Sequence, residues 1–400
     1  MNIFDQLLAD NQIPKFVRVR HEMDHSHIDD IEGAVAQAMR REGTLDRIKP
    51  GDSVCITAGS RDVANIARII RAICDQVKSV GAHPFIIPAM GSHAGAKAEG
   101  QRGIIEGYGV TEEAMGAPIR ASMDTEVIAH SKSGLEIHLD KFANAADFLI
   151  PVGRIKAHTD FRGEVESGIC KMLVIGMGKQ HGAYQCHKLG FKSMAANVKE
   201  FAGAIIEKKP NMFAIGLIEN AYHQTCRIEA IPAGRILEEE PPLLEYAKSR
   251  MAKVPFDQAD ILFVDETGKD ISGAGMDPNV TGRSPVLGIS RPFFQRIAVF
   301  DLTDKSHGNF GGLGSADVTT QRLYRKIDFE QTYPNGITAA EPLAVRLPAV
   351  MPSDRTAMQF ALRTATDCDW EKGPRIVWLK NTLSLSEFYI SEALIPDAEA

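Results

Sequence analysis

The chain has 400 residues, of which 44% are hydrophobic and 24% charged, and its 45 basic and 52 acidic residues give a formal net charge of −7. This length suits about two to three domains, and the composition is that of an ordinary globular protein, which excludes disorder, a collagen-like repeat and a disulfide scaffold. The negative net charge provides no overall positive field, so nucleic acid is not an expected partner.

The cysteines and the N-terminus predict a cytoplasmic protein. The six cysteines are scattered and form no C-x-x-C pair, unlike a disulfide framework or a zinc ribbon. The first residues include Asp5 and Asp10 and lack a basic region followed by a long apolar run, so no signal peptide is expected. No apolar stretch has the length needed to span a bilayer. We therefore expect no membrane partner, and homo-oligomerisation stays open.

Strand and helix signals alternate in the first half of the chain. Residues 54–57 predict a buried strand, and apolar residues at three- and four-residue spacing from Val63 to Val77 predict an amphipathic helix that Gly81 ends. Further apolar runs, each too short for an independent helix, lie at 85–88, 148–152 and 172–175. This alternation predicts a mainly parallel sheet covered by helices.

A charged segment with two prolines, Leu237–Pro242, and the helix-like stretch that follows to Lys253 predict a connector and a domain boundary. A second α/β unit follows, with strands expected at 261–264 and 297–300 and with glycine-rich loops. The sequence therefore predicts an α/β protein of two α/β domains with mainly parallel sheets, residues 1–250 and residues 251–400.

Three of the apolar runs in the first half lead into segments that carry histidine. These histidines are His93, His158 and, after the third run, His181 and His187. Because ligands bind beyond the carboxyl ends of the strands in open α/β sheets, we expect these segments to converge on one crevice. Gly91 and Gly95 on either side of His93 would let the backbone approach a ligand closely.

Lys171 stands immediately before the run at 172–175, where an unpaired charge is costly to bury. It could extend to solvent from a helix end, or it could be a nucleophilic or covalently modified lysine of lowered pKa. The glycine-rich residues 176–182 could hold a phosphate through backbone N–H groups at a helix start. A G-x-G-x-x-G fingerprint after the first strand, a Walker A motif and a G-x-S-x-G motif are all missing from the sequence.

Taken in order, several segments resemble the lactate racemase family of nickel-pincer enzymes, in its branch of 2-hydroxy-acid racemases and epimerases. These segments are Gly59-Ser60-Arg61, PAMGSHAGA, the stretch from Arg154 to Gly182, and Thr267-Gly268-Lys269-Asp270. The resemblance implies two α/β domains with a cleft that holds a nickel-pincer nucleotide, the mononucleotide of pyridinium-3-thioamide-5-thiocarboxylic acid. This cofactor binds nickel through two sulfurs and one carbon.

The resemblance also implies roles for individual residues. The cofactor would be bound by Lys171, Ser92, Gly178 and Lys179, the fourth nickel ligand would be His187 with His181 in reserve, the acid and base would be His93 and His158, and the substrate would be bound by Arg61, Lys269 and Asp270. Whether Lys171 joins the cofactor covalently stays open, because it follows Gly168-Ile169-Cys170 where lactate racemase has two glycines and an arginine.

The chemistry of the family explains this set of residues. Racemisation removes hydrogen from a secondary alcohol carbon and returns it to the opposite face, and deprotonating that carbon in an unactivated 2-hydroxy acid is very difficult. Hydride transfer to the cofactor avoids the carbanion, while one histidine takes the hydroxyl proton and the transient 2-keto acid is reduced from its other face. Each enantiomer therefore needs its own histidine. Sulfur, carbon and imidazole donors suit square-planar nickel(II).

Two alternatives remain open at this point. His93, His158 and His187 with Asp160 or Glu166 could hold zinc and activate water for hydrolysis. Alternatively, the chain could be a non-catalytic cofactor-binding protein.

Polar side chains expected in the loops favour a sugar acid or a dicarboxylic acid such as malate over lactate as substrate. They are Arg61, Lys269, Asp270, Arg283 and His307. Against a methyl-bearing substrate, each of these groups would lose water without gaining a partner.

Overall fold

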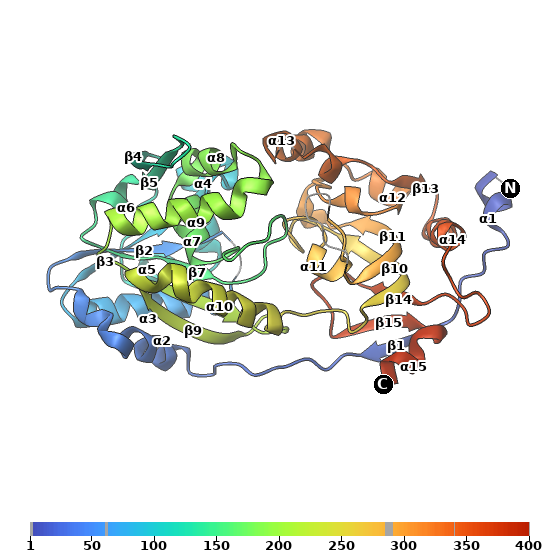
Figure 1. Cartoon of the computed structure of the whole chain (residues 1–400), viewed down its shortest axis with the longest axis horizontal. Helices are drawn as coiled ribbons and strands as arrows, with labels where there is room; N and C mark the ends of the chain where they lie inside the picture. Colours follow the sequence, from blue (N-terminus) through green and yellow to red (C-terminus); the bar gives the residue numbers. More distant parts are fainter. Residues whose placement is uncertain (1–2, 61–62, 285–290, 340, 400) are drawn as a thin grey trace. The chain divides into compact units, whose positions relative to one another are not determined.

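The computed structural model describes residues 3–60, 63–284, 291–339 and 341–399, and the chain divides into two compact units (Figure 1). The large unit comprises Asp24–Met251, and the small unit comprises Met1–Met23 with Ala252–Ala400. This corrects the expectation that the first 23 residues belong to the first domain. They belong to the small unit because β1 (Phe16–Arg20) pairs antiparallel with β15 (Glu387–Ser391) at the edge of its sheet.

The small unit is built on one seven-stranded sheet with the order β1-β15-β14-β10-β11-β12-β13. The neighbouring strands β14, β10, β11, β12 and β13 run parallel to one another, and the pairs β1/β15 and β14/β15 are antiparallel. The other strands are β10 (Gln258–Thr267), β11 (Phe293–Leu302), β12 (Val318–Thr320), β13 (Ala349–Met351) and β14 (Ile376–Leu379). The α-helices are α1 (Ile3–Leu8), α11 (Pro278–Thr281), α12 (Gln321–Tyr324), α13 (Phe329–Ala339), α14 (Asp354–Thr364) and α15 (Ile395–Glu399).

The large unit contains three smaller sheets. In one, β2 lies between β3 and β6 and runs parallel to both; in another, β8 pairs parallel with β7 and antiparallel with β9; the third is the β4/β5 hairpin. The strands are β2 (Ser53–Ala58), β3 (His83–Pro88), β4 (Thr125–His130), β5 (Glu136–Asp140), β6 (Phe148–Ile150), β7 (Val152–Arg154), β8 (Phe213–Glu219) and β9 (Thr225–Pro232). The α-helices are α2 (Ile31–Arg40), α3 (Ile66–Ser79), α4 (Ala98–Gly107), α5 (Glu112–Met115), α6 (Lys141–Ala145), α7 (Ile169–Lys171), α8 (Lys179–His187), α9 (Phe191–Lys208) and α10 (Ile236–Arg250).

The strands predicted from short apolar runs are confirmed in both units. They lie within β2, β3, β10 and β11, and nearly all of their residues are buried, as expected for parallel strands covered on both faces. The amphipathic helix is confirmed as α3, which buries its apolar residues from Ile66 to Val77. Gly81 follows α3 with φ of +79°, a conformation that glycine adopts at little steric cost.

Two of the predicted apolar runs have a different structure. The run at 148–152 is broken at Pro151 into β6, which pairs with β2, and β7, which pairs with β8. The run at 172–175 is not a strand but a π-helical turn, Met172–Gly176, between α7 and α8. The backbone N–H of Met177 donates to the carbonyl of Met172 at 2.9 Å, closing this wide turn. Wide turns of this type often occur at functional sites.

The segment from Leu237 to Lys253 is mostly helix α10, which continues unbroken through the two prolines, and the predicted domain boundary is confirmed just after this helix, between Met251 and Ala252. The helix includes Pro241 and Pro242 and buries Glu240, Leu243, Leu244 and Ala247. It packs against α7, β8 and β9 of the large unit. Packing of this apolar face offsets the hydrogen bonds that the two prolines cannot donate.

All six cysteines are free thiols, which agrees with the absence of a disulfide framework in the sequence pattern. Among the described residues, no helix is long and apolar enough to cross a membrane.

Candidate functional site

His93 lies where two neighbouring parallel strands of the large unit end. β2 leads to Ser60 and β3 leads to His93, and the Ser60 Oγ is 2.5 Å from the His93 Nδ1. Ser92 and His93 are exposed. The preceding Gly91 has φ of +62°, and a Cβ there would lie 3.1 Å from Ile175 Cγ2 of the π-helical turn. The His93 loop therefore lies against the segment that follows Lys171.

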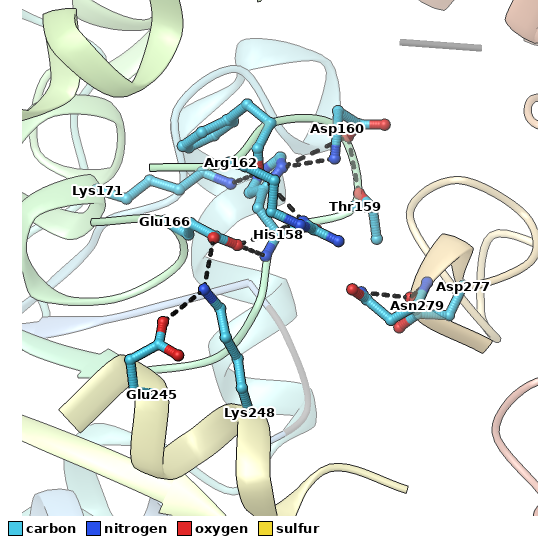
Figure 2. A network of polar contacts seen from close by, with 11 residues as sticks. His158, Thr159, Asp160, Arg162, Glu166, Lys171, Glu245, Lys248, Asp277 and Asn279 are labelled. Carbon is cyan, nitrogen blue, oxygen red and sulfur yellow. Dashed lines mark hydrogen bonds and ion pairs between the residues drawn. The ribbon is translucent and has the colours of Figure 1, made fainter. Parts of the chain in front are cut away.

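His158 lies on a loop that follows β7 and is closed by an antiparallel bridge between Lys156 and Ser167. Its backbone N–H donates to Oε2 of the buried Glu166 at 2.7 Å, and its Nδ1 accepts from the backbone N–H of Asp160 at 3.0 Å (Figure 2). The Phe161 ring lies 4.2 Å from the imidazole, centroid to centroid. Burial holds the pKa of His158 well below its ordinary value, so the ring is neutral at pH 7.

Lys171 contacts the other nitrogen of the same imidazole, with its Nζ 2.5 Å from His158 Nε2 (Figure 2). Because Nδ1 accepts the Asp160 N–H, a neutral His158 carries its proton on Nε2. Lys171 therefore occupies the Nε2 side of His158.

The short helix α7 presents Lys171, and Glu240 of α10 caps it. The backbone N–H of Cys170 donates to Glu240 Oε2 at 2.8 Å, which places a carboxyl group at the start of the helix. Burial raises the pKa of Glu240. A Cβ at Gly168 would lie 2.0 Å from Glu240 Oε1, so this carboxyl position requires glycine before the helix. Thus α10 supports the segment that carries Lys171.

His187, near the end of α8, has the features of a metal ligand. Its Nδ1–H donates to the carbonyl of Ala183 at 2.6 Å, because a carbonyl can only accept, and the lone pair of the neutral ring is therefore on Nε2. Burial lowers the pKa of His187 and favours this neutral form. The charge of Lys171 influences both His187 and His158, which shows that the three side chains lie near one another.

His181 lies toward a different part of the large unit. Its Nδ1 is 3.2 Å from Thr125 Oγ1, and its ring lies 5.5 Å from that of His138 in the β4/β5 hairpin. The reserve ligand of the sequence analysis therefore sits beside the hairpin, whereas His187 sits near Lys171.

Lys179 and Gly178 lie inside the large unit. The Lys179 side chain is fully buried, its Nζ is 3.2 Å from Oδ2 of the buried Asp140, and it also donates to the carbonyl of Pro88. A Cβ at Gly178 would lie 2.1 Å from the Val174 carbonyl oxygen. Both residues therefore serve the packing of this segment, and the predicted cofactor contact of Lys179 is not supported, because its ammonium group is already paired in the interior.

The thiols of Cys170 and Cys186, which precede Lys171 and His187 in the sequence, are protonated. Burial raises the pKa of Cys186 to about 12 and that of Cys170 well above its ordinary value.

The predicted substrate-binding residues lie in the small unit or outside the described residues. Lys269 and Asp270 follow β10, and Asp270 Oδ1 accepts from Thr303 Oγ1, which follows the parallel neighbour β11, at 2.5 Å. The Lys269 Nζ donates to the carbonyl of Gly273 at 2.6 Å. These loops therefore meet at the carboxyl edge of the sheet, as expected of parallel strands. Arg61 lies outside the described residues.

Arg283 and His307 also lie in loops of the small unit. The Arg283 guanidinium donates to Asp317 Oδ2 at 2.5 Å and to the carbonyl of Phe294 at 2.8 Å. Its side chain is therefore engaged in holding the unit together. His307 follows a short turn and has φ of +49°.

Among the described residues, no three His, Cys, Asp or Glu side chains are arranged to hold a metal ion. The predicted zinc set of His93, His158, His187 and a carboxylate is therefore not supported. Asp160 and Glu166 instead contact the His158 loop, through the Asp160 N–H to Nδ1 and the Glu166 carboxylate to the His158 N–H.

Three residues of this region had no predicted role of their own. Ser60 contacts His93, Glu240 caps α7, and Lys248 of α10 contacts Glu166. The sequence could have indicated Ser60 as a site residue, since it follows β2 as His93 follows β3. The sequence did not indicate Glu240 or Lys248, because their helix carries two prolines and many charges and has the pattern of a connector.

Comparison with known proteins identifies the family and the fold. Residues 4–198 match the family model for the lactate racemase N-terminal domain. No curated protein matches the chain. Among solved structures, the chain is similar to the lactate racemase apoprotein from Thermoanaerobacterium thermosaccharolyticum, with 16% sequence identity and a TM-score of 0.55, over 92% of this chain and 94% of that one. The similarity confirms the predicted α/β fold with mainly parallel sheets, and the family match confirms the resemblance.

Proposed function

We propose that this chain, which belongs to the lactate racemase family through residues 4–198, inverts the C2 stereocentre of a 2-hydroxy acid as a racemase or epimerase. The observation that carries the proposal is the gathering of His158, Lys171 and His187 in the large unit. The His93 loop lies against the same helical segment. Such a set offers two imidazoles for proton transfer and a third for a metal.

We further propose a nickel-pincer nucleotide as the cofactor, on the strength of the family membership. This group supplies a hydride acceptor when it is bound. His187 would hold its metal through Nε2, and Lys171 would anchor its organic part, with the exposed Ser92 nearby on the His93 loop. The fit rests on the neutral His187 ring, whose lone pair is directed by the bond from Nδ1–H to Ala183.

In this proposal His158 and His93 move the hydroxyl proton of the substrate. Taking a proton at His158 Nε2 requires the ring's own proton on Nδ1, where Asp160 Oδ2, 3.7 Å away, would stabilise the resulting imidazolium. Lys171 occupies Nε2 in this structure. A bond between the Lys171 amine and the cofactor would therefore release His158 for the substrate. The contact of His93 Nδ1 with Ser60 orients the second imidazole.

The experiment that tests the proposal is reconstitution with the cofactor, followed by incubation with single enantiomers of several 2-hydroxy acids. Appearance of the opposite enantiomer or epimer supports it. Cofactor that stays bound without any inversion would favour the non-catalytic alternative. No observation favours the zinc hydrolase. We propose the small-molecule acid and the cofactor as the partners, without nucleic acid or membrane, in a cytoplasmic protein.

Removing the proposed nickel ligand should release the metal. We expect His187→Ala to bind nickel more than about tenfold more weakly. A loss of about tenfold in metal affinity is the lower end of the effect of removing a residue that only hydrogen-bonds to a metal ligand, and removal of the ligand itself should cost more. Nickel remaining after gel filtration, measured by mass spectrometry, checks this. The matched control is His181→Ala, on the same helix but beside the hairpin, which should retain nickel like the parent. The reverse pattern would move the ligand to His181.

The substrate should be a polar 2-hydroxy acid, a sugar acid or a dicarboxylic acid, rather than lactate. This proposal keeps the polar loop residues expected to bind the substrate, of which Lys269 and Asp270 lie at the carboxyl edge of the small unit's sheet. Since an unmatched polar group costs about 1–3 kcal/mol, we expect kcat/KM for malate or an aldonic acid to exceed that for lactate at least about tenfold. Kinetics on the three acids check this, and a clear lead for lactate would contradict it.

A further inference from the structure

Glu166 is a fully buried carboxylate that touches a residue of the proposed site. Its side chain is 0% exposed, and it comes just before Ser167, whose pairing with Lys156 closes the His158 loop. A buried carboxylate is costly unless it is paired and hydrogen-bonded. Its presence inside this loop therefore requires partners that compensate its charge.

The partners of Glu166 converge on its two oxygens. Oε2 accepts from the backbone N–H of His158 at 2.7 Å and lies 3.4 Å from Arg162 Nη1, and Oε1 lies 3.0 Å from Lys248 Nζ (Figure 2). Arg162 also donates to the carbonyl of His158. The carboxylate and Arg162 thus hold both main-chain polar groups of His158.

Lys248 brings a distant element to this contact. It lies on α10, and its Nζ is also 2.8 Å from Oε1 of the exposed Glu245, one turn earlier (Figure 2). The same helix supplies Glu240 to α7. One helix therefore supports both the loop that carries His158 and the helix that carries Lys171.

We propose that Glu166 is a positioning residue for His158, held in place by Lys248 of α10. Fixing the His158 main chain sets the direction of its imidazole between the Phe161 ring and Lys171. A small displacement of such a group is costly to proton transfer, because catalytic geometry must be held closely. The role of His158 in proton transfer rests on the proposed function, whereas its placement by Glu166 does not.

The placement is tested first in cofactor-free protein, by NMR of ring-labelled histidines with the His158 signal identified through His158→Gln. Glu166→Ala should shift or broaden the His158 signal, and Glu166→Gln, which keeps an acceptor for the His158 N–H, should largely restore it. The matched control is Glu245→Gln, which removes only the exposed partner of Lys248 and should leave the signal unchanged. An unchanged His158 signal in Glu166→Ala would overturn the proposal.

The consequence for catalysis is tested with cofactor-loaded protein in single turnovers of each pure enantiomer. Glu166→Ala should slow the turnover of one enantiomer by about 10- to 100-fold. This should be the enantiomer whose turnover His158→Gln also slows, and turnover of the other enantiomer should be unchanged. Equal slowing of both enantiomers would indicate a general structural defect and would overturn the proposal.

Two further arrangements keep these tests decisive. If Glu166→Ala does not fold, Lys248→Met, which leaves Glu166 with Arg162 and the His158 N–H, should give the same effects in the same direction, and its failure to do so counts against the proposal. If the parent inverts no 2-hydroxy acid, the proposed function fails while the NMR comparison still decides the placement.

Discussion

His158→Gln is expected to slow racemisation by the cofactor-loaded protein about 10²- to 10⁴-fold, the usual contribution of a positioned acid or base. The imidazole is kept neutral by burial and is held on three sides by Asp160, Phe161 and Lys171, whereas glutamine cannot exchange a proton in this pH range. Chiral chromatography, starting from each pure enantiomer, measures the rate.

His181→Gln provides the control for this prediction, because His181 lies beside Thr125 and His138 in the hairpin and should be dispensable. In single turnovers, His158→Gln should slow the reaction of one enantiomer, and His93→Gln should slow the reaction of the other. Racemisation at the parent rate in both single variants would mean that these two residues are not the acid and base.

Lys179→Met is expected to destabilise the protein by about 3–5 kcal/mol, the cost of leaving one partner of a buried ion pair without the other. Both side chains are fully buried, and Asp140 also caps α6 by accepting the backbone N–H groups of Phe142 and Ala143. Urea denaturation of the cofactor-free protein measures the free energy of unfolding. Lys188→Met, at an exposed lysine just after α8, should change it little.

The loss of stability in Lys179→Met should depend on pH. Burial already raises the pKa of Asp140 in the folded parent, while Lys179 lowers it, so removing the lysine raises this pKa further. Between the ordinary pKa of an aspartate and the raised one, the folded state holds more protons than the unfolded state, so stability falls as pH rises through this window. We therefore expect a larger deficit at about pH 8 than at about pH 5.

A double variant separates the ion pair from the predicted cofactor contact of Lys179. Asp140→Asn keeps an acceptor for the α6 cap, and combined with Lys179→Met it should lose less stability than the sum of the single variants. Unchanged stability in Lys179→Met together with weaker cofactor retention would instead favour the cofactor contact.

The sequence alone determined the local elements and the order of the chemistry-bearing segments. Runs such as 54–57 and 85–88 are almost entirely apolar, which is what strands buried on both faces require, and the three- and four-residue spacing in α3 leaves one apolar face. Because β2 and β3 run parallel, their following residues, Ser60 and His93, meet at one edge.

Only the tertiary structure decided how these segments are supported. The run at 172–175 has the composition of a strand, yet the cap from Glu240 and the wide turn closed at Met177 make it helical. The sequence of α10 has the pattern of a connector, and its burial against the large unit overrides the two prolines. Both outcomes depend on packing partners distant in sequence, which local periodicity does not record.

The same reason explains why the fold places similar charged residues in different surroundings. Lys171 and Lys179 look alike in the sequence, each beside an apolar run, but the fold directs one toward His158 and the other toward the buried Asp140. Glu166 and Lys248 meet across about eighty residues of chain because α10 packs beneath the His158 loop. A charge can be buried only where the fold provides its partner, so the tertiary structure decides which charges are buried.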